Sequence, residues 1–345
     1  MSSNSRRVFR PNDAEIKLVP ILVFVLAFLA VRAVAQNPLE DIHIMPRTPL
    51  TATIEPNGPA YASPDSVHTA IRKNVDLVLV PVTVTDPMQR FVTGLSQDNF
   101  QVFENKKQQE IKHFSREDSP VSLGIILDIS RSMTDKVERM REVVKQFCET
   151  ANLQDEFFMI TFADKPQLVH DFTDSSQVIE EQLVLPAPKG RTALLDALYM
   201  GIRKMRDAKY SRKALLIISD GGDNHSRYSE GEVKSAAKES DVMIYAVGTF
   251  DRHVPTEEER LGPSLLTDLA QTTAGRAFIL TDLREMPVMA RRIAVELRTQ
   301  YVLAYRPDTP SHDGKWHKII VKLKLPKKLP YLQARAKKGY FAESE

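Results

Sequence analysis

Residues 122–132 read SLGIILDISRS, and this stretch decides the fold class. An apolar run stops abruptly at Asp128, and two serines follow at every second position, Ser130 and Ser132. A short apolar run bounded by polar residues is typical of a strand that is buried on both faces, as in a parallel sheet. The stretch therefore predicts a central strand whose carboxyl end presents oxygen atoms.

Strand-like runs alternate with helical patterns through the middle of the chain, from about Val121 to Arg298. The helical pattern TDKVERMREVVKQFCETANL follows the first strand, and KALLIISD and VMIYAVGTF are later apolar runs. This rhythm predicts an α/β fold with a doubly wound, mostly parallel sheet and helices on both faces. The run PQLVHDF follows its predecessor too closely for a crossover helix, so we expect an antiparallel edge strand there.

Segments rich in β-strand patterns flank this middle part. VDLVLVPVTVTD precedes it, and QYVLAYRP and KWHKIIVKLKL follow it. Either flank alone is too short for a stable core. We therefore expect the flanks to pair into one small β-sandwich with the α/β domain inserted between them. The expected boundaries are 75–118 for the first β-rich segment, 119–299 for the inserted domain and 300–345 for the second β-rich segment.

The first 35 residues have the pattern of an export signal. Basic residues are followed by the apolar run LVPILVFVLAFLAV and by the small residues of Ala33-Val34-Ala35. This run is short for a membrane span of about 20 residues, so we expect cleavage of residues 1–35 and a periplasmic or secreted protein. The alternative is an inner-membrane anchor made by the uncleaved segment. Residues 36–74 are polar and rich in proline, which predicts a disordered linker.

The charge balance does not indicate a nucleic-acid-binding protein. The formal net charge is +2. Residues 1–35 contribute five basic and two acidic side chains, so the rest of the chain has a charge of about −1. Residues 315–338 are basic, but lysines on exposed strands commonly prevent aggregation between sheets, and no aromatic platform for a single strand lies beside them. We expect no nucleic-acid partner, and no small-molecule substrate is evident.

Side chains that carry oxygen gather at the carboxyl ends of the predicted strands. Asp128 and Asp220 each end a strand, and open α/β sheets bind ligands at that edge, where the strand order reverses. The hydroxyl groups of Ser130, Ser132 and Thr192 follow in neighbouring loops. Carboxylates and hydroxyls suit hard divalent ions, so we expect Mg²⁺, with Mn²⁺ or Ca²⁺ as alternatives. An ion held mostly by neutral hydroxyls keeps room for an outside carboxylate.

Three segments resemble the metal-ion-dependent adhesion site (MIDAS) of von Willebrand factor type A (VWA) domains: DISRS at residues 128–132, Thr192 within GRTALLDAL, and SDGGDN at residues 219–224. The resemblance implies that the five oxygen-bearing residues named above bind the ion directly or through water. It also implies a non-enzymatic adhesion module that binds an Asp or Glu carboxylate of a protein partner. Family behaviour further implies that the last helix, around residues 285–299, shifts on binding. The flanks resemble those of exported bacterial proteins with an embedded VWA domain.

Four residues beside the motif are candidate contacts for the partner. Arg131 stands where such motifs often have glycine, so it would alter access to the ion or add a contact for an acidic partner. Asp223, Asn224 and His225 closely follow the acidic end of the later strand. The alternative for these residues is ordinary turn chemistry, since GGDN is a common turn sequence.

Two other functions remain open on the sequence. The first is a metal-dependent hydrolase or phosphotransferase. An aspartyl phosphatase would need a second acid where Ser130 stands, however, and the chain has no GxSxG, GxxxxGK[ST] or GxGxxG motif. The second is a metal-free scaffold, in which these Asp, Ser and Thr residues only cap helices. The complete set of five oxygen ligands at one sheet edge favours a metal site over the scaffold, and the missing catalytic motifs favour a protein that is not an enzyme.

Overall fold

The computed structural model describes residues 77–116, 118–249, 257–307, 313–325 and 331–342. All of them belong to one compact unit. The expected signal segment and linker lie outside the described residues. Among the described residues, no helix is both long and apolar enough to cross a membrane.

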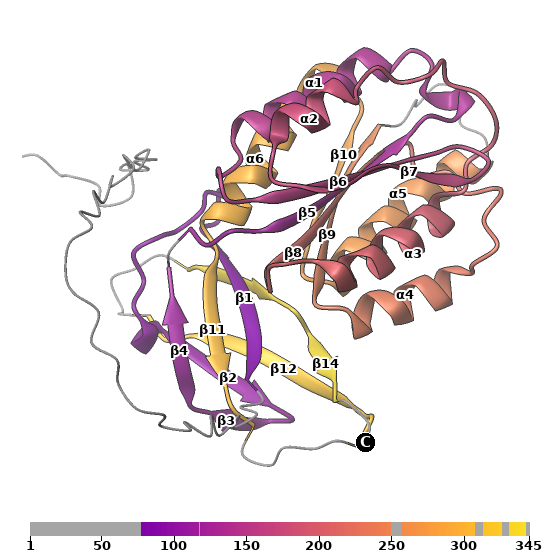
Figure 1. Ribbon diagram of the computed structural model, residues 1–345. Helices are drawn as coiled ribbons and strands as arrows, with labels where there is room; N and C mark the ends of the chain where they lie inside the picture. The colour runs from indigo at the N-terminus through magenta and orange to yellow at the C-terminus, as the bar shows by residue number, and fades with distance from the viewer. Residues whose placement is uncertain (1–76, 117, 250–256, 308–312, 326–330, 343–345) are drawn as a thin grey trace, which may run out of the picture. The chain divides into compact units, whose positions relative to one another are not determined.

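A mostly parallel sheet forms the centre of the α/β domain (Figure 1). Its strands are β5 (Ser122–Asp128), β6 (Glu156–Phe162), β7 (Pro166–Thr173), β8 (Lys213–Ser219), β9 (Val242–Thr249) and β10 (Ala277–Leu280). Within the described residues their order is β10-β9-β8-β5-β6-β7, with β7 alone antiparallel to its neighbour. The predicted fold class is confirmed, including the edge strand. The chain leaves β5 toward β6 and later returns to β8 on the other side, so the strand order reverses beside β5.

Helices cover both faces of this sheet, as Figure 1 shows. One face packs against α1 (Val137–Glu149), α2 (Ser176–Glu181) and α6 (Met286–Arg298), and the other packs against α3 (Leu194–Lys204), α4 (Glu230–Glu239) and α5 (Glu257–Thr272). All residues of β5 are buried, because Leu123, Ile125 and Leu127 contact the first set of helices and Ile126 contacts the second. A central strand covered on both faces must be apolar throughout, which explains the run that precedes Asp128.

Two antiparallel sheets form the second part of the compact unit. Their strands are β1 (Val78–Thr85), β2 (Phe100–Glu104), β3 (Lys107–Gln109), β4 (Ile111–Ser115), β11 (Tyr301–Tyr305), β12 (Trp316–Leu323), β13 (Gln333–Ala336) and β14 (Gly339–Phe341). In the described residues the sheet orders are β13-β1-β11-β4 and β14-β12-β2-β3. Each sheet thus contains strands from both flanks of the α/β domain. Their shared core includes Val80, Val82, Leu303 and the tilted ring pair of Phe100 and Tyr301, with centroids 4.9 Å apart.

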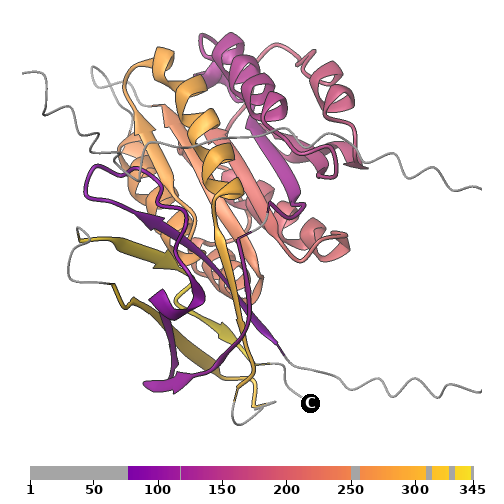
Figure 2. The same cartoon turned by 90° about the vertical axis from the view of Figure 1, so that its left-hand side faces the viewer.

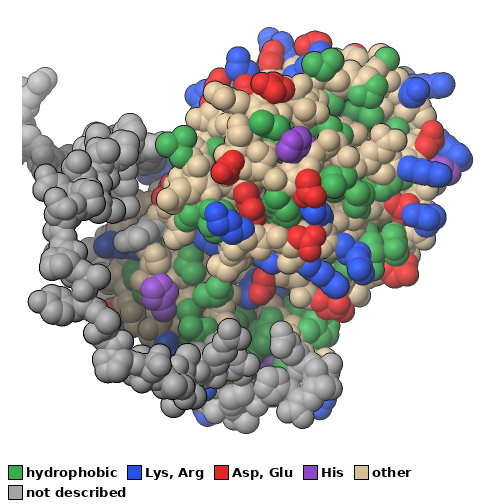
Figure 3. All heavy atoms as spheres, in the orientation of Figure 1, with side chains coloured by type: hydrophobic (Ala, Val, Ile, Leu, Met, Phe, Trp, Pro, Cys, Tyr) green, Lys and Arg blue, Asp and Glu red, His purple; other side chains and the backbone are tan. Residues whose placement is uncertain are grey.

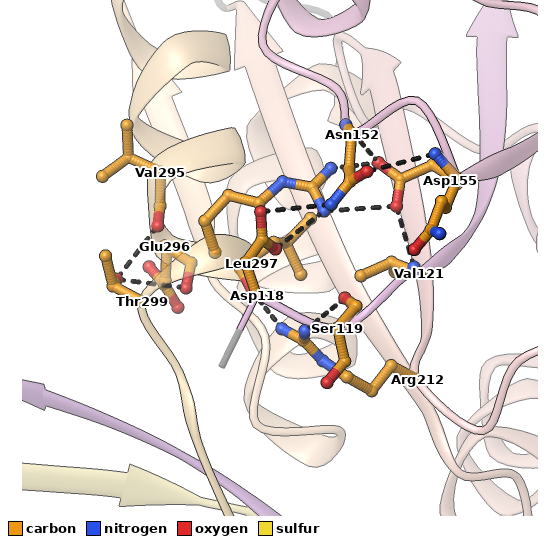
Figure 4. Close-up of polar contacts among 12 residues, drawn as sticks. Asp118, Ser119, Val121, Asn152, Asp155, Arg212, Val295, Glu296, Leu297 and Thr299 are labelled. Carbon is orange, nitrogen blue, oxygen red and sulfur yellow. Dashed lines mark hydrogen bonds and ion pairs between the residues drawn. The ribbon is translucent and has the colours of Figure 1, made fainter. Parts of the chain in front are cut away.

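Hydrogen bonds and an ion pair of buried charged side chains connect the two ends of the α/β domain (Figure 4). Asp155 is fully buried and accepts hydrogen bonds from the backbone N–H groups of Val121 (2.8 Å) and Asn152 (2.9 Å). It also forms an ion pair with Arg298, the last residue of α6. Arg212 donates to the carbonyl oxygen of Ser119 at 2.6 Å and to that of Leu297. The chain therefore enters and leaves the inserted domain at neighbouring points. Short 3-10 helices lie at Gln97–Asn99, Arg131–Met133, Met205–Asp207 and Leu283–Glu285.

Helix α6 passes almost directly into β11 (Figure 2). Glu296, near its end, is fully buried, and its Oε1 accepts hydrogen bonds from Tyr245 Oη (3.0 Å) and Thr83 Oγ1 (3.3 Å). The same oxygen pairs with the guanidinium of Arg335 in β13. The last helix of the α/β domain is thus bonded to both β1 and β13 of the neighbouring sheet.

Candidate metal centre

Asp128 ends β5 with a fully buried side chain. Its Oδ2 accepts a hydrogen bond from Ser219 Oγ at 2.6 Å, and its Oδ1 accepts one from the backbone N–H of Ser130 at 2.9 Å. The first contact comes from the neighbouring strand β8 and the second from the loop that follows β5. The carboxylate is therefore held on two sides at the point where the strand order reverses.

The two serines after Asp128 lie with their hydroxyls together. Ser130 is buried and precedes the 3-10 turn Arg131–Met133, in which Ser132 is half-buried. Their Oγ atoms are 3.1 Å apart. The tight turn brings the side chains of alternate residues to the same side, so two neutral oxygens face one small volume.

The segment that carries Thr192 is bonded to this serine loop. Lys189 N–H donates to Ile129 O at 3.0 Å, and Arg131 N–H donates to Gly190 O at 3.4 Å. Gly190 has a φ of +83°, and a Cβ atom there would lie 2.6 Å from Asp164 Oδ2, so only glycine fits without rearrangement. The turn places Thr192, which is 5% exposed, directly before α3.

The third segment follows β8 and is hydrogen-bonded to the Thr192 segment. Asp220 is buried, and Gly221 after it has a φ of +75°, with no space for a Cβ beside the backbone of Gly262. The backbone N–H groups of Asn224 and His225 donate to Thr192 O at 3.0 and 3.1 Å. Asn224 Oδ1 in return accepts from Thr192 N–H at 2.9 Å. Direct hydrogen bonds thus connect all three predicted segments at one edge of the sheet.

Two buried carboxylates and one ammonium group meet at this edge of the sheet. Burial, and next the nearby Asp220 carboxylate, raise the pKa of Asp128 to about 7. The ammonium group of Lys136 lies 3.4 Å from Asp220 Oδ2. No group of three or more His, Cys, Asp or Glu side chains suited to a metal occurs in the described part of the chain. The donor set is therefore two carboxylates and neutral hydroxyls, which fits a hard divalent ion.

The four candidate partner contacts lie around this edge. Arg131 is exposed, and His225 Nε2 is 3.1 Å from an Nη atom of Arg191 at the rim. Asp223 Oδ1 accepts hydrogen bonds within the chain, from the backbone of Leu195 at 3.3 Å and from Ser226 Oγ at 2.6 Å. Asn224 is exposed although its side-chain oxygen is bonded to the Thr192 segment. Partner contact by these four residues stays a prediction.

Three further residues support the site, and the sequence analysis did not single them out. Ser219 holds the Asp128 carboxylate, and Lys136 pairs with Asp220. Asp196 is buried in α3, and its Oδ1 accepts from the backbone N–H groups of Arg227 (2.8 Å) and Tyr228 (3.0 Å). This contact fixes the far end of the loop that begins at Asp220. Of these three residues, Ser219 could have been identified from the sequence, because it lies directly before the acid that ends a strand.

The part of the chain that carries this site matches a known protein family. The family model of the von Willebrand factor type A domain matches residues 123–292. A conserved hypothetical protein BatB from Bacteroides thetaiotaomicron has a solved structure with 18% identity and a TM-score of 0.42, covering 51% of this chain and 98% of that chain. A von Willebrand factor type A structure from Catenulispora acidiphila has 14% identity and a TM-score of 0.47, covering 79% and 64%. No curated protein matches the chain.

A third similar structure is proximal thread matrix protein 1 from the mussel byssus, solved with a zinc-occupied MIDAS motif. It has 18% identity and a TM-score of 0.44, and the match covers 56% of this chain and 49% of that chain. The family match, the mostly parallel sheet with helices on both faces and the order of the three segments lead to one assignment. Residues 123–292 of this chain are a von Willebrand factor type A domain.

Proposed function

We propose that this protein is a non-enzymatic interaction module that binds an acidic group of a protein partner through a divalent cation. Asp128, Ser130, Ser132, Thr192 and Asp220 would hold the ion, and Mg²⁺ suits these ligands best. VWA domains generally are interaction modules, which supports a binding role over a catalytic one.

One observation carries the proposal: hydrogen bonds join three segments that are distant in sequence into a single cluster of oxygen donors. The Asp128 carboxylate, the paired hydroxyls of Ser130 and Ser132 and the Thr192 loop all lie at the reversal of strand order. Ligands of open α/β sheets bind at this place. Helix capping does not explain the cluster, because Ser130 makes no side-chain cap bond to the turn that follows it, and the N-cap position of α3 is occupied by Ala193 and not by Thr192.

The ligand types explain why an acidic partner group is expected. Hydroxyl oxygens carry no formal charge, so an ion that they hold keeps more positive charge than an ion in a cage of carboxylates. When bound, the ion would supply an electrophilic position for an outside carboxylate. Exposed Arg131 adds a positive charge beside that position. Binding of the ion and binding of the acidic partner would therefore strengthen each other.

Export is a further part of the proposal and rests on the sequence of residues 1–35. A basic segment, an apolar run and small residues before position 36 support a periplasmic or secreted location. The uncleaved alternative would place the same binding site outside the inner membrane. In both cases the VWA domain would meet partners beyond the cytoplasm.

Calorimetric titration of Mg²⁺, Mn²⁺, Ca²⁺ and Zn²⁺ into the chelator-treated full-length chain tests the ion site. We expect saturable binding that falls at least about tenfold, or about 1.4 kcal/mol, in Thr192→Ala and Asp128→Ala. Zn²⁺ is included because the mussel protein holds it in its motif. Asp135→Asn is the matched control, since Asp135 is an exposed acid next to the motif. Equal binding in all four proteins would contradict the proposal.

A further inference from the structure

Lys136 places a positive charge inside the metal centre. Its residue is 9% exposed, and its Nζ lies 3.4 Å from Asp220 Oδ2, which is also buried. The backbone of Lys136 is fixed at the start of α1, because its N–H donates to Met133 O (3.0 Å) and its carbonyl accepts from Met140 N–H (2.9 Å). The side chain therefore reaches Asp220 from a rigid position and does not extend into solvent.

The burial of the Lys136 side chain beside Asp220 requires a physical explanation. Burying an ammonium group is costly unless an opposite charge compensates it. The Asp128 carboxylate has hydrogen bonds from Ser219 and from the backbone of Ser130, whereas Asp220 is the residue that the ammonium group neutralises. Lys136 and Asp220 thus stabilise each other, although Asp220 is also a proposed ligand of the divalent ion.

We propose that Lys136 is a built-in counter-cation of the metal centre, which pairs with Asp220 when no divalent ion is bound and lowers the affinity of the site for such an ion. This inference rests on the function proposed above. A divalent ion must share Asp220 with the ammonium group or displace it, and like charges a few ångströms apart repel strongly in a partly buried site. Lys136 thereby sets the ion concentration at which the module can bind its partner.

The same lysine changes the charge of the loaded site. Two carboxylates neutralise one divalent ion, so the ammonium group leaves one net positive charge at the centre. An acidic group from a partner would remove that excess charge. Lys136 therefore favours partner-dependent loading over tight binding of the ion alone.

Substitution Lys136→Met tests the inference, since it keeps the length of the side chain and removes its charge. Mg²⁺ is titrated by calorimetry, and free Mn²⁺ is counted by electron paramagnetic resonance, with the full-length chain in both cases. We expect Lys136→Met to bind both ions at least about tenfold more tightly than the wild type, or about 1.4 kcal/mol. Lys136→Arg, which keeps the charge, should bind like the wild type. Lys145→Met, which removes an exposed lysine of the same helix, should also bind like the wild type.

Thermal unfolding gives a readout that does not depend on measured affinity. Without a divalent ion, Lys136→Met should melt at a lower temperature than the wild type, because the buried Asp220 carboxylate loses its counter-charge. Saturating Mg²⁺ should then raise its melting temperature by more than it raises that of the wild type. A smaller or equal rise would overturn the inference.

The outcomes separate this inference from the proposed function. If the wild type binds ions and Lys136→Met binds them equally or more weakly, the role of Lys136 is overturned and the ion site stands. If neither protein binds an ion, the proposed function fails, and this inference fails with it. Binding by Lys136→Met alone would support the counter-cation, because it would show that Lys136 prevents the native chain from binding the ion in the absence of a partner.

Discussion

Single buried charges in this protein depend on the partners that surround them, and His317 in β12 is a clear case outside the metal centre. It is 8% exposed, and its Nδ1 lies 2.8 Å from Glu104 Oε1 while its Nε2 lies 3.3 Å from Asp313 Oδ1. Burial lowers the pKa of His317, but its hydrogen bonds with Glu104 and Asp313 outweigh burial, so the pKa is raised above 6.5. The folded protein therefore holds this proton more tightly than the unfolded chain does.

His317 should make the free energy of unfolding depend on pH. Its raised pKa contributes stability that is fully present below about pH 6.5 and is lost as the pH rises through the folded-state pKa. Urea unfolding at a series of pH values should show that the wild type loses stability on this rise, relative to His317→Gln. The comparison with His317→Gln isolates the contribution of His317 from that of other groups that titrate in the same pH range, such as Asp128.

His113→Gln is the matched control for this measurement, because His113 is an exposed histidine in β4 of the neighbouring sheet. It should retain the pH dependence of the wild type. A parallel pH dependence in wild type and His317→Gln would show that the contacts with Glu104 and Asp313 contribute no proton-linked stability.

The position of the oxygen-bearing residues at one sheet edge could be predicted from the sequence, whereas the burial of a charged partner beside them could not. Their binding of an ion stays a prediction. Asp128, Ser130 and Asp220 directly follow apolar strands, so the sheet rule places them at one edge. Lys136 lies four residues beyond Ser132 at the start of an amphipathic helix, where a lysine is ordinarily solvated. Its burial results from the path of the 3-10 turn between Ser130 and α1, and the hydrophobic pattern carries no information about that turn.

At the scale of elements, α6 is bonded to strands of a neighbouring β-sheet through Glu296. Glu296 contacts Tyr245 within the domain and Thr83 and Arg335 outside it. Burial and the Glu296 carboxylate raise the pKa of Tyr245 well above its ordinary value, so it remains a hydrogen-bond donor. The family resemblance implies that this last helix shifts on ligand binding, which stays a prediction. Any such shift would have to change the contacts of Glu296 with β1 and β13.

Removing Arg335 should destabilise the protein by leaving a buried carboxylate without its counter-ion. We expect Arg335→Met to lower the free energy of unfolding by about 3 kcal/mol in urea denaturation. The double variant Glu296→Gln/Arg335→Met should be more stable than Arg335→Met, because no uncompensated charge then remains. Lys338→Met, which removes an exposed lysine beside β13, should cost little. A double variant less stable than the single one would argue against the ion pair as the main contact.

Long elements of this fold were predictable and short ones were not. The parallel strands, the longer helices and the edge strand β7 follow from apolar runs and helical periodicity. Helix α2 (Ser176–Glu181) and strand β14 (Gly339–Phe341) were not predicted, because six and three residues are too few to establish a period. Both form because they pack on neighbours, α2 through buried Ile179 and β14 through its pairing with β12.

At the scale of the whole compact unit, the two flanks pair as their lengths suggested, but their distribution between sheets could not be predicted. β1 and β4 enter one sheet while β2 and β3 enter the other. Alternation of apolar residues indicates which face of a strand is buried, but it does not identify the strand beside it. Contacts such as Val80 with Leu303 decide the pairing only after folding brings both flanks together.

The surface of the VWA domain carries charges of both signs. Figure 3 shows Lys and Arg side chains interspersed with Asp and Glu over its visible face. A mixed surface gives weak long-range attraction for either sign of partner. Recognition of an acidic group would then depend on the local charge of the metal centre and of Arg131, and less on the total charge of the domain.

An anomalous difference map from crystals of the chain soaked in Mn²⁺ would locate the ion. We expect one strong peak bordered by the hydroxyl oxygens of Ser130, Ser132 and Thr192, with the carboxylates of Asp128 and Asp220 nearby. A map without a peak at this sheet edge at saturating Mn²⁺, or with peaks only at exposed carboxylates elsewhere, would contradict this expectation.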